Sequence, residues 1–407
     1  MKFFRLFLSL ALPLFILCNV SAQEKLSKTE RTLLDQAMNN AGKNKPELSK
    51  ALKAVPAKEL RAMAFLITYM PQTDRETLTA NFLLDNVRQA YKARENFSWC
   101  KSLPDSVFFN EVLPYAVLDE HRDNWRQDFY NRFTPLVTNC TNIYGAIDSV
   151  NRKIAKQLKT DYNVKRKKVN QSPYESIEQG MATCTGLSIL LVDAFRAVGI
   201  PSRLAGIPNW TTKNGNHNWV EVLIDGKWYF TEYYPDALNK SWFVADAGKA
   251  DPARPEYSIY ASSFKPTQTY FPLIWDSTQR GIHGYNVTKR YIDIYNEQLR
   301  EQQLPGDEMI LNVVLFKDES CTPDGNNRIH SKITLLKDGK ETDFGFSPSP
   351  TDDMNKFLVF KVKKNSKYTL EFAALDKTIS TEIVTSADGE MTQHLYVEKQ
   401  PVAEKKL

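Results

Sequence analysis

The sequence predicts an α+β protein with a helical N-terminal region, a central core in which a helix packs on an antiparallel sheet, and a C-terminal β-sandwich. Three observations lead to this prediction. Apolar residues recur at helical spacing over residues 23–150. One amphipathic segment and a β-hairpin follow within residues 151–303. Short alternating segments, separated by turn residues, then fill residues 304–407.

The composition is that of a folded protein and excludes several classes. Of the 407 residues, 42% are hydrophobic and 25% are charged, which rules out a mostly disordered, collagen-like or coiled-coil chain. The formal charge of +5 is too small for the basic surface of a nucleic-acid binder. No phosphate-binding glycine loop, H-E-x-x-H motif or close cysteine pair occurs, so we expect no nucleotide, no metal and no other cofactor.

Residues 1–22 have the pattern of a secretory signal peptide. Basic residues precede an apolar run that ends at Leu17, and the small Ala22 closes the segment. We therefore expect an exported protein, periplasmic, cell-surface or secreted, without a transmembrane span in the mature chain. Cys18 offers an alternative, anchoring as a lipoprotein, although the large Leu17 before it suits lipid modification poorly.

The N-terminal region, residues 23–150, is predicted to form helices that pack on the central region. Ser27 and Glu30 have the spacing of a capping box at the first helix start. Cys100 and Cys140 lie further along this region. In an oxidising compartment one disulfide is expected, with Cys100 and Cys140 as a candidate pair and the other thiols free or buried.

The central region, residues 151–303, holds the residues that carry chemistry. Cys184 directly precedes apolar residues at helical spacing from Leu187 to Val198, so it opens a helix. At a helix N-terminus the unpaired amides and the macrodipole favour a thiolate over a thiol. The alternative is a small buried thiol that only fills space, as most free cysteines do.

A β-hairpin is predicted after this helix, between residues 216 and 232. Its strands alternate polar and apolar side chains around Asp225-Gly226, a strong signal for a two-residue turn. Such a turn fixes the register, so that residue 224 pairs with residue 227.

Side chains two residues apart in this hairpin share one face of the sheet. His217 and Glu232 then face the same way, as does Asp236 if the strand continues that far. Diagonal neighbours lie about 7–8 Å apart, within reach of a long carboxylate. A helix-start thiol, an imidazole and a carboxylate are the nucleophile, base and orienting acid of acyl transfer through a thioester. We therefore predict Cys184, His217 and Glu232 as catalytic residues, with Asp236 as the alternative acid.

At these residues the sequence resembles the transglutaminase-like superfamily of papain-like thiol enzymes. The resemblance covers about residues 172–242 and rests on four motifs: Cys184, R-A-V-G-I-P-S-R at 196–203, H-N-W-V-E-V at 217–222 and G-K-W at 226–228. It implies a papain-like core and an enzyme that acts on amide bonds of a peptide or protein, a protease or amidase. Hydrolysis, deamidation and amide exchange all remain open.

One position departs from the family pattern. The third catalytic residue is usually an Asp four residues after the last motif's tryptophan, and here Glu232 stands in its place. Nearby Trp210, Trp219 and Tyr234 are candidates for lining an acyl-binding cleft, with core packing as the alternative.

Three functions from different classes are consistent with these residues. The first is an exported cysteine-dependent enzyme acting on amide bonds. The second is a catalytically idle protein that keeps the fold and binds a peptide or glycan, and a purely structural surface module is a third. The β-sandwich has no cluster of titratable residues, and its Cys321 has no partner signature, so the sandwich is expected to be a spacer or a binding accessory.

Overall fold

The computed structural model describes residues 26–235, 237–278, 280–302, 306–319, 327–352, 356–374 and 377–398. The predicted signal peptide, Cys18, Asp236 and Cys321 lie outside these ranges. Within the ranges, no helix combines the length and the apolar character that crossing a membrane requires.

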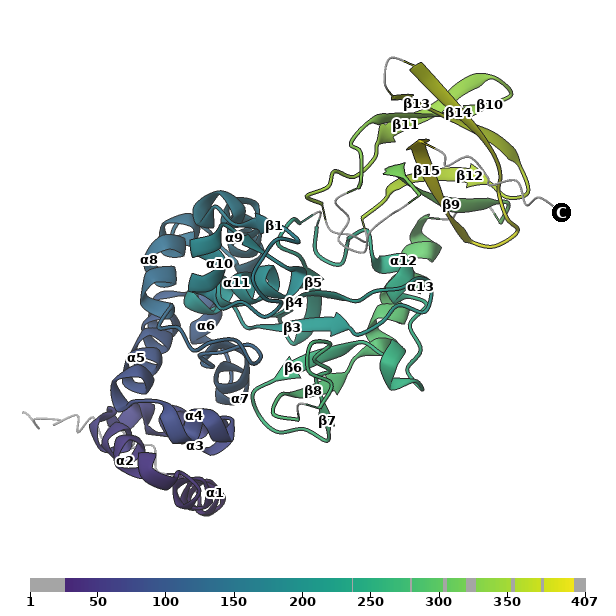
Figure 1. The fold of residues 1–407 in the computed structure, drawn as a ribbon. Helices are drawn as coiled ribbons and strands as arrows, with labels where there is room; N and C mark the ends of the chain where they lie inside the picture. The colour runs from purple at the N-terminus through teal and green to yellow at the C-terminus, as the bar shows by residue number, and fades with distance from the viewer. Residues whose placement is uncertain are drawn as a thin grey trace, which may run out of the picture.

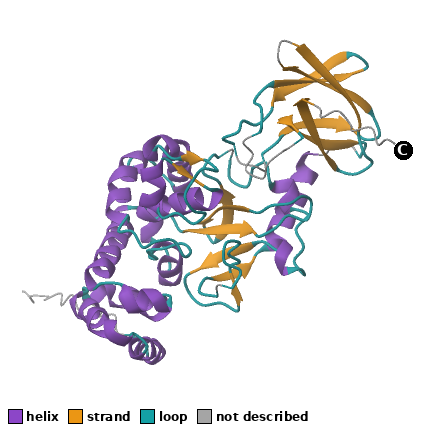
Figure 2. Ribbon diagram, viewed as in Figure 1, coloured by secondary structure: helices purple, strands orange, loops and turns teal. Residues whose placement is uncertain are grey.

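The fold is α+β, as predicted (Figures 1 and 2). Helices come first along the chain, a six-stranded sheet with its own helices comes next, and two small sheets end it. In Figure 1 the helices that come first along the chain lie on the left, and the two small sheets stand apart at the upper right, beyond α13 (Thr288–Gln302).

Nine α-helices and a π-helical turn make up the first part of the described chain. Their bounds are α1 (Lys28–Asn39), α2 (Lys45–Ala54), α3 (Leu60–Tyr69), α4 (Gln72–Thr77), α5 (Ala80–Asn96), α6 (Ser98–Lys101), α7 (Asp105–Val107), η3 (Phe108–Val112), α8 (Arg126–Val137) and α9 (Ile143–Leu158). The predicted capping box is confirmed, since Ser27 N–H donates to the Glu30 carboxylate and Ser27 Oγ accepts from Glu30 N–H.

The helical region is continuous with the core rather than a separate body. Helix α9 runs across residue 150, where the sequence placed a boundary. Apolar side chains from Leu34 to Ile282 form a single buried cluster that includes both the early helices and the cysteine helix α11 (Cys184–Ala197). The first helices therefore help to hold α11 in place.

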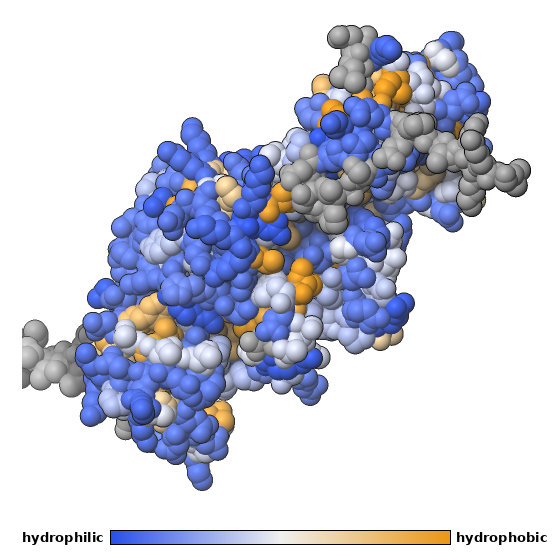
Figure 3. Space-filling model, viewed as in Figure 1, coloured by the Kyte–Doolittle hydropathy of each residue, from blue (hydrophilic) through white to orange (hydrophobic). Residues whose placement is uncertain are grey.

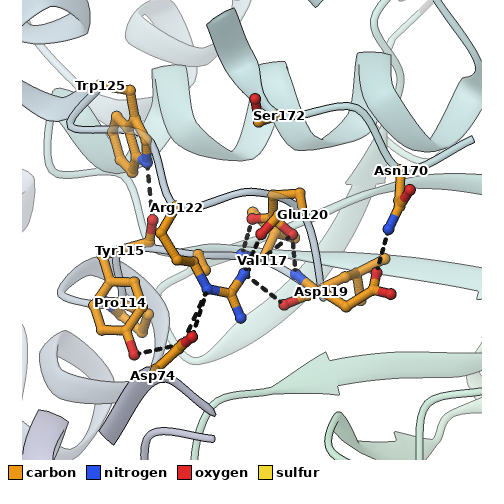
Figure 4. Close-up of polar contacts among 12 residues, drawn as sticks. Asp74, Pro114, Tyr115, Val117, Asp119, Glu120, Arg122, Trp125, Asn170 and Ser172 are labelled. Atoms are coloured by element: carbon orange, nitrogen blue, oxygen red, sulfur yellow. Dashed lines mark hydrogen bonds and ion pairs between the residues drawn. The ribbon is translucent and has the colours of Figure 1, made fainter. Parts of the chain in front are cut away.

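A loop between η3 and α8 is fixed by polar contacts (Figure 4). Arg122 points its guanidinium at Asp74, with Nε 2.9 Å from the carboxylate, and Tyr115 donates its hydroxyl to the same group at 2.8 Å. Asn170 donates to Asp119 of this loop at 3.0 Å. Because Asn170 lies on the stretch that leads to α11, the loop also positions the approach to the cysteine helix.

Cys100 and Cys140 do not form the predicted disulfide, since both thiols are free. Cys100 is buried in α6 and faces the end of α11, where a Cβ added to Gly199 would lie 2.9 Å from its sulfur. Cys140 follows α8 and lies beside Gly145 instead. The two cysteines occupy different helix contacts, so the pairing was wrong. Burial raises the pKa of the Cys100 thiol to about 12.

The central sheet is antiparallel and has the order β5-β4-β3-β6-β8-β7. Its strands are β3 (Ser202–Ile207), β4 (His217–Ile224), β5 (Lys227–Thr231), β6 (Tyr260–Ser263), β7 (Thr269–Tyr270) and β8 (His283–Asn286). Helix α11 packs on β3 and β4. The central region also contains a parallel pair, β1 (Asp161–Tyr162) with β2 (Met181–Ala182), and the helices α10 (Pro173–Gln179), α12 (Val244–Ala247) and α13 (Thr288–Gln302).

The predicted hairpin register is confirmed. Ile224 pairs with Lys227, and the ladder continues to Val220 opposite Thr231. Asp225 and Gly226 have φ angles of 49° and 78°, as a two-residue turn with both central residues in the left-handed region requires. The ladder ends at Thr231, so Glu232 lies just beyond the strand.

The C-terminal part is a sandwich of two sheets, ordered β11-β10-β13-β14 and β12-β9-β15. Its strands are β9 (Glu308–Asp318), β10 (Lys332–Lys337), β11 (Lys340–Phe346), β12 (Leu358–Lys363), β13 (Lys367–Ala374), β14 (Lys377–Val384) and β15 (Glu390–Glu398). Apolar side chains from both sheets, such as Leu311 and Leu370, fill the space between them. Lys249 joins the sandwich to the rest of the chain through an ion pair with Glu390 at 2.6 Å.

Candidate active site

Cys184 is the first residue of α11 and is half-buried. The preceding Thr183 caps the helix, because its hydroxyl oxygen accepts from Gly186 N–H at 3.0 Å. The hydroxyl also donates to the Val169 carbonyl at 2.7 Å, which anchors the cap. The amides of Cys184 and Thr185 belong to the first helical turn, where a helix provides no carbonyl partner of its own. They are therefore donors next to the thiol.

His217 opens β4 and is only 2% exposed. Its Nε2 lies 2.7 Å from Oε1 of Glu232. The second oxygen of Glu232 accepts from the Ser241 hydroxyl, and the Glu232 carbonyl accepts from Asn151 of α9 at 2.7 Å. Glu232 is therefore held at its backbone and at both carboxylate oxygens, and it fixes the orientation of the imidazole.

Aromatic rings pack around the His217 imidazole. Their centroids lie 4.9 Å away for Trp242, 5.3 Å for Phe243 and 5.7 Å for Trp219. Trp219 in turn donates its indole N–H to the Tyr291 hydroxyl at 2.6 Å. These contacts leave the imidazole little freedom to rotate.

The two tryptophans predicted to line a cleft do not do so. Trp210 is 1% exposed and Trp219 is fully buried, and the two rings stack at 6.4 Å between centroids. Both belong to a buried cluster with residues of α12 and α13, so the alternative of core packing holds for both rings, and neither lines the cavity. Tyr234 is half exposed, lines the cavity beside His217, and donates its hydroxyl to Asp161 at 2.8 Å.

A buried ionic cluster fixes the strand that carries His217. Glu221, four residues further along β4, accepts from Arg203 at 2.8 Å, from Arg290 and from the Tyr291 hydroxyl at 2.9 Å. Burial raises the pKa of the Glu221 carboxyl, but the two arginines outweigh burial and bring the pKa below its usual value. Glu221 is therefore a charged anchor between β4 and α13.

The start of β4 is also tied to the cysteine helix. Asn218 donates its side-chain amide to the Thr185 hydroxyl at 2.7 Å, one residue after Cys184. On β3, Gly206 pairs with Asn218, and a Cβ at Gly206 would overlap Asn218 Oδ1 and lie 2.8 Å from the His217 carbonyl oxygen. A glycine is therefore required for the strands and the helix start to approach this closely.

We expect Gly206→Ala to destabilise the fold, because its methyl group must displace Asn218 and the His217 backbone. Overpacking of a tight interior costs about 1–3 kcal/mol. Denaturant unfolding followed by tryptophan fluorescence measures this loss. Gly389→Ala is the matched control, because a Cβ there meets nothing within 4 Å. Equal unfolding midpoints for the two variants would contradict the tight contact.

Cys184, His217 and Glu232 line one cavity of about 1400 Å³. Of the two acids that the sequence proposed, Glu232 contacts His217, and Asp236 lies outside the described residues. The cavity's charged groups are balanced, three of each sign: Arg152, Lys240, Lys356, Asp161, Glu232 and Asp352. Across the described part of the chain, no His, Cys, Asp and Glu side chains gather in a metal-binding group.

Ser241 and Trp242 are site residues that sequence reasoning missed. They lie on the loop after β5 that folds back over Glu232 and His217, and both line the cavity. Asn151 and Asn218 were missed as well. Asn218 stands in the same motif as His217, but nothing in the motif indicates its contact with Thr185; Asn151, Ser241 and Trp242 stand in no pattern that points to His217, and only the fold brings them there.

The three site residues lie in a part of the chain that matches a known family. The family model described as the transglutaminase-like superfamily matches residues 131–233, which include Cys184, His217 and Glu232. No curated protein matches the chain. Among solved structures, a candidate cysteine protease from Cytophaga hutchinsonii is 17% identical with a TM-score of 0.26, over 33% of this chain and 44% of that protein. The chain thus spans less than half of that protein's length. The region from residue 131 to residue 233 belongs to the transglutaminase-like superfamily.

Proposed function

We propose that this protein is an exported cysteine-dependent enzyme that acts on amide bonds of peptides or proteins through a thioester. The observation that carries the proposal is the meeting of Cys184, His217 and Glu232 in one cavity, with the imidazole held by the carboxylate. Export rests on the signal-peptide pattern of residues 1–22.

The first half of the reaction uses the helix start. The Cys184 thiolate attacks the amide carbonyl carbon, a C–S bond forms, and the negative charge moves to the carbonyl oxygen. The N–H groups of Cys184 and Thr185 stabilise this oxyanion, because they point out of the first turn of α11. His217 takes the thiol proton at Nδ1, since Nε2 is engaged by Glu232.

The second half releases the amine and resolves the thioester. His217 returns its proton to the leaving nitrogen as the C–N bond breaks. Water then attacks the thioester carbonyl, the C–S bond breaks, and a carboxylic acid leaves. If an amine attacks instead, the product is a new amide. Glu232 keeps the imidazole oriented and stabilises its charged form in both halves.

The size of the cavity favours a polymeric substrate. Clefts for single small molecules hold about 300–1,000 Å³, whereas this cavity holds about 1400 Å³. A peptide segment of several residues suits it better than a single small amide.

A screen of peptides and amine donors, comparing the mature protein with Cys184→Ala, tests the proposal. Mass spectrometry separates the three reactions: a cleaved backbone, a deamidated glutamine or asparagine, or an incorporated amine. We expect at least one of these products from the wild type and none from the variant. Peptide binding without any product would instead support the idle binding protein, and equal products from both proteins would contradict the role of Cys184.

A further inference from the structure

The β-sandwich supplies one wall of the cavity that contains Cys184. Five of its residues line this space, and we name them the sandwich wall: Thr351, Asp352, Lys356, Phe357 and Val359. On the face drawn in Figure 3, hydrophobic residues gather near the middle of the molecule, beside the place where the sandwich joins the rest of the chain. The sandwich therefore borders the site and is not a remote spacer.

Two apolar side chains of the sandwich wall point away from the sandwich's own core. Along β12, Phe360 and Val362 are buried between the two sheets. Val359 has the opposite parity on this strand, so it faces the other way. Phe357 directly precedes the strand, and neither residue belongs to the buried cluster between the two sheets. Val359 is 46% exposed, and Phe357 is half-buried. Packing within the sandwich does not account for either residue.

Phe357 is connected to the aromatic cluster around His217 through Lys213. The Lys213 ammonium lies 4.7 Å from the centre of the Phe357 ring and 5.1 Å from that of Trp242. Lys213 is itself fixed by an ion pair with Asp246 at 2.5 Å. The Trp242 ring packs against His217, so a short chain of contacts sets the distance from the sandwich wall to the imidazole.

The charges of the sandwich wall cancel. Lys356 forms an ion pair with Asp352 at 3.0 Å. On the core side the same cavity is lined by Leu187, Tyr234 and Trp242, together with charged groups of both signs such as Asp161 and Lys240. A side chain that lies against Phe357 and Val359 would contact a ring and methyl groups of the sandwich wall, and the paired charges of Lys356 and Asp352 require no counter-charge from it. An uncharged apolar side chain is the chemistry that fits.

We propose that the sandwich wall binds an apolar side chain of the peptide substrate, such as leucine, methionine or phenylalanine, and so takes part in substrate selection. This inference rests on the proposed function, because it assigns the occupant of the same cavity. It gives the sandwich a direct role in recognition through Phe357 and Val359.

Protection of Cys184 from iodoacetamide tests the proposal without requiring turnover. The probes are N-acetyl hexapeptide amides that contain one glutamine and either leucine or phenylalanine, and matched peptides with alanine in place of the apolar residue. We expect the apolar peptides to protect wild-type Cys184 at lower concentration than the alanine peptides. In Phe357→Ala and Val359→Ala this preference should fall about 10-fold or more, the range for lost contacts in an apolar pocket.

Matched controls come from the other sheet of the sandwich. Phe344→Ala on β11 and Val384→Ala on β14 remove the same side chains from positions that are 53% and 67% exposed and do not line the cavity. Both should keep the wild-type preference. Thermal unfolding checks that each variant is folded. If Phe357→Ala loosens the sandwich, Val359→Ala still tests the proposal, because it removes an exposed side chain.

Turnover of the same peptides separates this inference from the proposed function. If peptides are turned over but Phe357→Ala and Val359→Ala keep the wild-type preference, the sandwich wall proposal is overturned and the enzyme proposal stands. If the preference exists and depends on both residues without any turnover, the wall is supported and the enzyme proposal fails. If no peptide protects Cys184 at millimolar concentration, the wall proposal is overturned too.

Discussion

Replacing Cys184 with alanine should lower kcat on any amide substrate by about 10⁴-fold or more, because removal of the nucleophile leaves no route to a thioester. KM should change little, since the thiol contributes little to substrate contact in so large a cavity. The measurement is steady-state kinetics on the best peptide from the screen, supported by mass spectrometry of the trapped thioester in the wild type.

Cys140→Ala is the control for this variant. Cys140 is also a free and partly accessible thiol, but it lies after α8 and does not line the cavity. Its replacement should leave kcat unchanged. Cys184→Ala should unfold at the wild-type temperature, because alanine is tolerated at the first position of a helix. Cys140→Ala should do so too, because Cys140 lies outside the helices and is only partly buried. A Cys184→Ala protein that retains wild-type kcat would refute the thioester route.

Glu232→Gln should lower kcat by about 10²–10⁴-fold, the range seen when the acid behind a catalytic histidine becomes an amide. Gln preserves the size of the side chain but removes the charge that stabilises the imidazolium. The Gln amide can also donate to His217 Nε2, which favours the ring tautomer with its proton on Nδ1. That tautomer cannot accept the thiol proton at Nδ1. The pH dependence of kcat should change with it, which a purely structural role of Glu232 would not produce.

Two further variants sharpen the result for Glu232. Glu178→Gln makes the same chemical change on α10, at a position that does not line the cavity, and kcat should stay at the wild-type value. Glu232→Asp restores the acid usual in the family but is one methylene shorter than the side chain that makes the 2.7 Å contact. We expect an intermediate kcat. Full activity of Glu232→Gln would shift the orienting role to another group.

Local signals in the sequence were enough to predict the helix start and the hairpin. Thr183 caps α11, and the Asp225-Gly226 turn fixes the register of β4 and β5. Both are local interactions, so the positions of Cys184 at a helix start and of His217 on a strand could be predicted. Glu232 contacts His217, as predicted. It does so from just beyond β5 and not as a paired strand residue, because the pairing of β4 with β5 ends at Thr231.

Features that depend on distant parts of the chain were not predictable. Trp210 and Trp219 are buried in a cluster that includes Tyr291 of α13, far along the chain, as the contact between Trp219 and Tyr291 shows. Cys100 and Cys140 have a spacing that allows a bridge, but each packs against a different helix. Phe357 enters the site from the sandwich, and nothing near it in the sequence points to His217.

The rate at which iodoacetamide alkylates each thiol, followed by mass spectrometry in the wild type and in His217→Ala, measures whether Cys184 is a nucleophile activated by His217. We expect Cys184 to react fastest near neutral pH, Cys140 more slowly, and Cys100 only after unfolding, because burial raises the pKa of Cys100 to about 12. In His217→Ala the Cys184 rate should fall about 10-fold or more, while the Cys140 rate stays the same. A Cys184 rate equal to that of Cys140 in both proteins would contradict the pairing of this thiol with His217.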